Sequence, residues 1–158
     1  MDFEDFKNKR INDVSRLIGN GQICPEELTR FYLQRISSDP RSEEIFTEVY
    51  KKSALASAKE SKKRAKVGLR RGKLDGIPIS VKDLADIKGK LTGGGSSLTN
   101  RGKARNNATF VDNLKGQGAI ILGKTHMTEL AFSGLGLNPI TATPTNPFNE
   151  ELVSGGSS

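Results

Sequence analysis

The sequence predicts an α/β fold, because its two halves differ in periodicity. Apolar residues recur at helical spacing through most of the first 70 residues, which favours helices there. Beyond Gly68 the chain is rich in Gly, Ser, Thr and Asn, and two short apolar runs, 77–81 and 119–122, are typical of buried strands. With 34 % hydrophobic and 27 % charged residues over 158 positions, the composition is that of one globular domain with its own core.

The first two expected helices have clear boundary signals. The first runs over about residues 5–18 and ends at Gly19, because glycine commonly terminates helices. The second begins at Pro25, a favoured first helical residue, with Glu26 and Glu27 at the positive end of the helix dipole. The apolar side of the first helix consists of Phe6, Ile11, Val14, Leu17 and Ile18.

A short strand and a basic helix are expected next. Residues 45–50 read Ile-Phe-Thr-Glu-Val-Tyr, a short mixture of apolar and polar residues that predicts a strand. Ser53 is expected to cap a third helix over 54–67, whose apolar side is small and whose other side is dense in Lys and Arg. The remaining expected elements are a strand at 77–81, a helix at 108–114, a strand at 119–122, a short helix at 126–132 and a loop-like stretch at 133–158.

The chain carries a formal net charge of +7, which raises the expectation of an anionic partner. The excess is local, since eight of the 25 basic residues lie within Lys59–Lys73. A module that binds nucleic acid or another polyanion through this run is one alternative. No aromatic residues interrupt the run to stack on bases, so a solvated helix face is favoured.

Single copies of cysteine and histidine exclude two kinds of site. Cys24 alone cannot form an internal disulfide, and Cys24 with His126 cannot supply an ordinary Cys/His zinc site. The N-terminus lacks the basic and apolar regions of a secretory signal, and no run approaches the ~20 apolar residues of a membrane span. We therefore expect a cytoplasmic protein without a membrane partner.

Residues 118–125 match the phosphate-binding pattern G-x-x-x-x-G-K-[ST]. That mechanism needs a loop between the two glycines, whose free backbone N–H groups bind phosphate. Here the four intervening residues are Ala-Ile-Ile-Leu, which favour a strand with paired N–H groups. A P-loop nucleotide-binding module stays as a disfavoured alternative.

Two other clusters contain residues that could take part in catalysis. Lys82 follows an apolar strand, and apolar surroundings favour the uncharged amine that can act as a base. The competing interpretation is a lysine that reaches solvent and pairs with Asp83. Residues 154–158 read Ser-Gly-Gly-Ser-Ser, in which glycines permit unusual backbone geometry beside a serine, although a flexible tail has the same composition.

Together, these segments resemble the amidase signature family of serine amide hydrolases. Several motifs occur in order, and together they are more specific than any one of them. The matching residues are 74–83, Thr92, Gly95 and Ser96, 118–133, Asn146 to Phe148 and 154–158. The resemblance implies a mixed β-sheet with helices on both faces, of which this chain holds the first part. It also implies one incomplete amidase domain over 1–158, with a helical N-terminal part (1–70) and the first part of the catalytic core (71–158).

The resemblance implies roles for four residues. Lys82 matches the catalytic lysine, and Ser157 matches the bridging serine, which family members hold after a cis peptide bond. Ala131 and Ser133 match a segment that lines the substrate pocket. The implied reaction is hydrolysis of a small-molecule amide at its carbon–nitrogen bond, with no metal and no organic cofactor. The nucleophilic serine of the family lies beyond Ser158, so we expect the chain to be inactive alone.

The subfamily and the partners stay open at this point. The chain matches either a stand-alone amidase, which could form a homodimer, or the A subunit of a tRNA-dependent amidotransferase, whose partners would be tRNA and the other subunits. Residues 133–139 look closer to stand-alone amidases, whereas the net charge of +7 favours the amidotransferase subunit. His126 and Asn107 depart from the family, in which Asn and Asp respectively are common.

Overall fold

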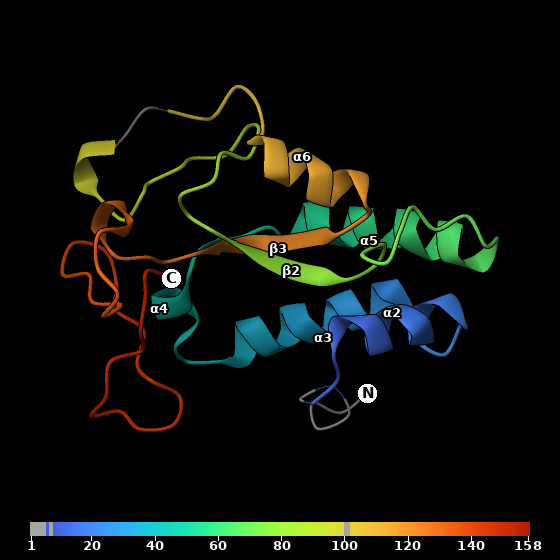
Figure 1. Cartoon of the computed structure of the whole chain (residues 1–158), viewed down its shortest axis with the longest axis horizontal. Coiled ribbons are helices and arrows are strands. Elements are labelled where there is room, and N and C mark those ends of the chain that lie inside the picture. Colours follow the sequence, from blue (N-terminus) through green and yellow to red (C-terminus); the bar gives the residue numbers. More distant parts are fainter. Residues whose placement is uncertain (1–5, 7, 100–101) are drawn as a thin grey trace. The chain divides into compact units, whose positions relative to one another are not determined.

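The computed structural model of the chain describes residue 6 and residues 8–99 and 102–158. Figure 1 shows the elements in chain order. The chain divides into two compact units, each built from three separate stretches of sequence. The first unit comprises Met1–Ser37, Tyr50–Ile79 and Asn113–Leu122, and the second comprises Ser38–Val49, Ser80–Asp112 and Gly123–Ser158.

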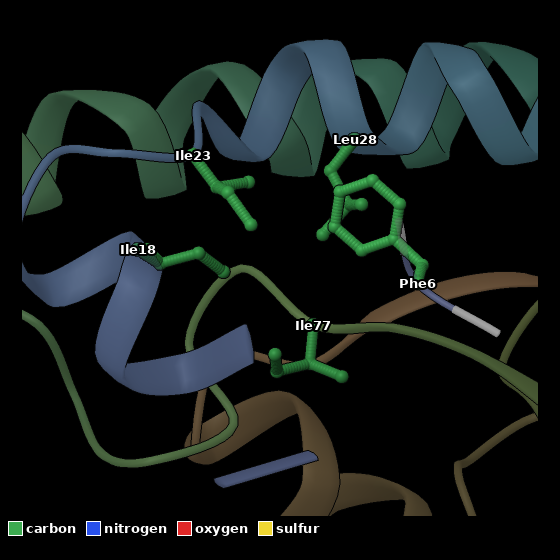
Figure 2. Packing of buried hydrophobic residues seen from close by; sticks show 5 residues of the cluster. All are labelled: Phe6, Ile18, Ile23, Leu28 and Ile77. Atoms are coloured by element: carbon green, nitrogen blue, oxygen red, sulfur yellow. The ribbon is translucent and has the colours of Figure 1, made fainter. Parts of the chain in front are cut away.

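Helices α2 (Ile11–Gly19) and α3 (Pro25–Ser38) contribute to the core of the first unit. Pro25 begins α3 as predicted, with acidic residues in the first turn. The helix predicted over 5–18 is interrupted, because Phe6 is helical but Arg10 is extended (φ −73°, ψ 155°) and α2 begins only at Ile11. Ile11 is 54 % exposed and therefore does not belong to the buried apolar side. The core cluster in Figure 2 consists of Phe6, Ile18, Ile23, Leu28 and Ile77.

Helix α5 (Lys51–Lys66) buries the small side that its sequence predicts, at Ala54 and Ala58. The predicted cap at Ser53 is wrong, because the helix begins directly after Tyr50. The backbone N–H of Tyr50 is held by Leu122 O at 2.6 Å, so the chain turns into the helix at that point. The Ser53 hydroxyl instead donates back to Tyr50 O at 3.2 Å.

Asp75 is a fully buried carboxylate beside the last turn of α5. Arg64 donates to both of its oxygens at 2.7 Å, and the backbone N–H of Arg71 donates to one of them at 2.9 Å. Burial alone would raise the pKa of Asp75, but the hydrogen bonds from Arg64 and Arg71 outweigh it and hold that pKa below its ordinary value.

The sheet has the strand order β1-β3-β2. Strand β1 (Phe46–Val49) pairs antiparallel with β3 (Ile120–Thr125), with an irregular register between Phe46 and Glu48. Strand β2 (Pro78–Lys82) runs parallel to β3, because Ile120 N donates to Ile77 O and Asp83 N donates to Thr125 O. The mixed sheet and the α/β class are therefore confirmed.

The remaining described elements are short. Helix α4 (Ser42–Ile45) was not predicted, and α6 (Thr109–Gly116) lies close to its expected place. One turn of 3₁₀ helix, η1 (Ser97–Thr99), follows the Gly-rich loop. None of the described helices has the length and apolar character that a membrane span requires.

The helix predicted at 126–132 is wrong. The segment contains only a 3₁₀ turn, η2 (Glu129–Ala131), since Leu130 (φ 49°) and Ala131 (φ 60°) adopt left-handed backbone conformations that no α-helix accepts. From Phe132 onward the chain has neither helix nor strand, as predicted.

Candidate functional site

Lys82 and Ser157 meet in the second unit. Lys82 is the last residue of β2, and its Nζ donates a hydrogen bond to Ser157 Oγ. Both side chains are half-buried. The interpretation in which Lys82 pairs with Asp83 is wrong, because that carboxylate is bound to Lys124. An amine and a hydroxyl in direct contact can exchange a proton, which is the first requirement for a nucleophilic relay.

Ser157 is held mainly through the backbone. The Gly156–Ser157 peptide bond is cis, and Ser157 O accepts a hydrogen bond from the backbone N–H of Thr128 at 3.0 Å. The two preceding glycines donate from their backbone N–H groups, Gly156 to Gly134 O at 2.8 Å and Gly155 to Leu135 O at 3.2 Å. The last residues of the chain are therefore tied to the segment that follows η2.

Thr128 links this backbone to the two residues predicted to line the substrate pocket. Its hydroxyl donates to Ser133 O at 3.1 Å, and its carbonyl accepts the backbone N–H of Ala131 at 3.0 Å. Because Thr128 N also binds Ser157 O, the structure brings Ala131 and Ser133 to the same place as the Lys82–Ser157 contact.

Asn138 is a buried support that the sequence did not indicate. It is 2 % exposed, and its amide nitrogen donates to Gly95 O and Met127 O, both at 2.7 Å. Its amide oxygen accepts the backbone N–H groups of Ile140 and Thr141. An asparagine before a proline inside a long loop gives no pattern from which these distant partners could be inferred.

Lys124, the lysine of the P-loop-like pattern, is buried and fully engaged. It is 1 % exposed and pairs with Asp83 Oδ1 at 2.9 Å. It also donates to Leu91 O at 2.6 Å and to Thr92 Oγ1 at 2.7 Å. Because a lysine ammonium has three donors, none remains for a phosphate.

The two glycines of the same pattern also have structural explanations. Gly118 has φ +84°, a left-handed turn conformation at which any side chain would contact Asp75. Gly123 lies in β3, where a Cβ would collide with Glu48 O of the neighbouring strand. The residues between them form a strand and not a phosphate-binding loop, so the P-loop hypothesis is wrong.

His126 is not a member of the Lys82–Ser157 contact. Burial lowers the pKa of its imidazole below the usual range, and this effect outweighs a hydrogen bond to the backbone of Glu43. Its Nδ1 is buried and has no hydrogen-bond partner among the described residues. The backbone of His126 makes two hydrogen bonds: His126 N donates to Ile45 O at 2.9 Å, and His126 O accepts from the Ser158 hydroxyl.

The basic run is largely used within the first unit. Lys62 pairs with Glu26 at 3.1 Å, and Arg64 pairs with the buried Asp75 at 2.7 Å. Lys63 pairs with Glu60 at 2.7 Å on the exposed face. The exposed Lys63–Glu60 pair agrees with the interpretation of a solvated helix face. In the part of the chain that the structure describes, no group of acidic, His and Cys residues has the arrangement of a metal site.

Comparison with known proteins decides the family. A model of the Amidase family matches residues 27–158. The chain belongs to the amidase family. Two curated relatives of this amidase chain are both glutamyl-tRNA(Gln) amidotransferase A subunits. The one from Desulfotalea psychrophila is 37 % identical over 148 residues, which is 94 % of this chain and 30 % of the relative. The one from Pelodictyon phaeoclathratiforme is 34 % identical over 158 residues, which is 100 % of this chain and 32 % of the relative.

The solved structures agree on the amidase fold. The peptide amidase of Stenotrophomonas maltophilia superimposes with a TM-score of 0.84 at 27 % identity, covering 96 % of this chain and 32 % of that protein. The amidase chain thus spans about a third of the length of the proteins that it matches.

Proposed function

We propose that this amidase chain supplies two members of a Ser–Ser–Lys proton relay that hydrolyses a carbon–nitrogen amide bond. The observation that carries the proposal is the hydrogen bond from Lys82 Nζ to Ser157 Oγ. A lysine at the end of a strand has a fixed backbone, and Ser157 is fixed by its carbonyl bond to Thr128, so the contact joins two anchored groups. Membership of the amidase family supports the same chemistry.

In the proposed reaction, uncharged Lys82 accepts a proton from Ser157, and Ser157 accepts one from a nucleophilic serine. That serine attacks the amide carbonyl and forms an acyl-enzyme, while the relay returns a proton to the departing amine. Water then attacks the acyl group and regenerates the serine. The proposed nucleophile lies outside residues 1–158, in the remaining part of the amidase domain of which this chain is proposed to be the first part.

Ala131 and Ser133 are proposed to contact the substrate beside this relay. Both belong to the segment that Thr128 ties to Ser157, and both are half-buried. A small-molecule amide is the proposed substrate, and the proposed chemistry uses neither a metal nor an organic cofactor.

A second candidate is the A subunit of a tRNA-dependent amidotransferase, which the names of the curated relatives favour. Under this proposal the partners are the other amidotransferase subunits and glutamyl-tRNA. The likeness to peptide amidase favours the stand-alone enzyme instead. The two candidates differ in whether amide hydrolysis requires partner subunits. The homodimer stays a prediction for the stand-alone enzyme, and the cytoplasmic location stays a prediction under both.

The test is a hybrid enzyme in which this chain replaces the aligned region of the Pelodictyon relative, which matches it over 158 residues. Lys82→Ala is expected to lower kcat/KM by about 100-fold or more, the usual scale of general-base catalysis. Lys88→Ala removes an exposed lysine of the same unit and is expected to leave activity unchanged. A folded Lys82→Ala hybrid that keeps more than about a tenth of the activity would refute the relay.

A further inference from the structure

Asp83, the residue that follows Lys82, is bound to the end of β3. We call Lys124–His126 the β3 exit segment. Asp83 N donates to Thr125 O at 3.0 Å, and Asp83 Oδ1 pairs with Lys124 Nζ at 2.9 Å. Since Asp83 is joined to Lys82 by one peptide bond, these contacts fix the backbone from which the Lys82 side chain extends.

Ser158, the residue that follows Ser157, is hydrogen-bonded to the same β3 exit segment. Ser158 Oγ donates to His126 O at 2.7 Å and lies 2.7 Å from Thr125 Oγ1, which is free to donate to it. Three consecutive residues therefore hold the neighbours of both members of the Lys82–Ser157 contact, although those members are far apart in the sequence.

We propose that the β3 exit segment is a positioning element that holds Lys82 and Ser157 in hydrogen-bond contact, with the Lys124–Asp83 ion pair as its electrostatic anchor. This inference rests on the proposed function for its catalytic meaning, but its geometric content can be tested without activity. It also gives a role to the lysine and threonine of the P-loop-like pattern, which bind no phosphate in this fold.

The anchor is well suited to fixing a position. The Lys124 ammonium directs its three donors at Asp83, Leu91 O and Thr92 Oγ1, within 2.6–2.9 Å. The second oxygen of Asp83 accepts the backbone N–H of Gly93 at 3.0 Å. An ion pair in a buried, poorly polarisable site is a strong and directional constraint, whereas either charge alone is costly there.

The decisive variant therefore removes both charges together. Lys124→Gln with Asp83→Asn leaves no uncompensated buried charge, so the fold is expected to survive. Glutamine is shorter than lysine and its amide is uncharged, so it cannot hold all three partners. In NMR spectra of the 158-residue chain, we expect a nuclear Overhauser contact between the Lys82 ε-protons and the Ser157 β-protons. The double variant is expected to lose it.

The matched control is Lys90→Gln with Glu48→Gln, which neutralises a more exposed lysine–glutamate pair of the same unit. This control is expected to keep the Lys82–Ser157 contact. The inference is overturned if the contact is missing from the unmodified chain, or if it persists in a folded double variant.

Thr125→Val provides a second test if the double variant does not fold. Valine has nearly the shape of threonine and removes only the hydroxyl that faces Ser158. We expect a weaker Lys82–Ser157 contact with an unchanged backbone spectrum in the first unit. An undiminished Lys82–Ser157 contact in the Thr125→Val variant would overturn the inference.

The hybrid enzyme separates this inference from the proposed function. If both hold, the double variant lowers kcat by about tenfold to a hundredfold with little change in KM, because misplaced catalytic groups affect the chemical step. If the contact is lost while kcat is unchanged, the positioning role stands and the Lys82–Ser157 relay is refuted. If the contact persists in the folded double variant, the positioning role is refuted and the relay is untouched.

Discussion

At the scale of single residues, the site depends on buried polar groups whose hydrogen bonds are all used within the loops. Asn138 joins the Gly95 and Met127 carbonyls, while Thr128 joins Ser133 to Ser157. Since these loops lack helix or strand ladders, side-chain bonds supply the order that regular structure supplies elsewhere.

Asn138→Leu tests this support. The substitution keeps the side-chain size but leaves two carbonyls and two N–H groups without their partner. An unsatisfied buried polar group costs about 1–3 kcal/mol, so we expect a loss of roughly 2–4 kcal/mol in the free energy of unfolding. Urea denaturation of the chain measures it. Asn106→Ala, at an exposed position, is expected to cost less than about 0.5 kcal/mol. A similar small cost for Asn138→Leu would contradict this account.

At the scale of elements, the basic helix α5 binds the buried carboxylate of Asp75. Arg64 of α5 forms a two-pronged bond with Asp75, and Arg70 donates to the Asp75 carbonyl at 2.9 Å. The helix has few large apolar residues, and its buried side consists of Ala54, Ala58 and Ser61. The Arg64–Asp75 ion pair therefore adds to the contacts of this small buried side and to the Lys62–Glu26 pair.

The pKa of Asp75 makes this attachment dependent on pH. Because the pKa is lower in the folded chain than its ordinary value of 3.8, unfolding at acid pH takes up a proton. The stabilisation is complete above that value and is lost as the pH falls through and below it. We expect the urea midpoint of the unmodified chain to fall more steeply below pH 3.8 than that of Asp75→Asn. Asp86→Asn, at an exposed position, should follow the unmodified chain. Parallel curves for the unmodified chain and Asp75→Asn would rule out this linkage.

The elements that the sequence predicted well are those with local signals. Proline and two glutamates mark the start of α3, and β2 and β3 begin within one residue of the predicted runs. The helix predicted at 126–132 failed because Leu130 is held in a left-handed conformation by a bond to Gly94 O, which lies far away in the sequence. No local pattern contains such a bond.

The candidate site shows the same difference between residues that the sequence identifies and contacts that it does not. Lys82 and Ser157 were selected by their resemblance to a family, since neither residue is distinctive alone. The Lys124–Asp83 pair was missed, because a lysine in an apolar run gives no sign of the carboxylate that accompanies it. Pairings across loops depend on the whole fold, and sequence periodicity does not contain them.

At the scale of the whole molecule, the amidase chain spans about a third of its relatives. The proposed relay takes its attacking serine from outside residues 1–158. We expect the 158-residue chain to resist stoichiometric labelling by a fluorophosphonate probe, while the hybrid enzyme is labelled at one serine. The physical reason is that neither Ser157 nor Ser158 is placed as a nucleophile in the proposed relay. Mass spectrometry of the intact proteins measures the labelling. A fully labelled 158-residue chain would mean that the nucleophile lies within these residues.

The buried pair of Lys124 and Asp83 also constrains how the sequence can change over generations. Replacing either residue alone leaves an unpaired charge in the interior, which destabilises the fold by about 3–5 kcal/mol. This loss is comparable with the whole free energy of unfolding of many domains. Replacing both with uncharged residues is tolerable for stability, but single-step mutation must first pass through an unstable ancestor. We therefore expect the two positions to be inherited together, as a lysine with an aspartate, across the lineages that carry this domain.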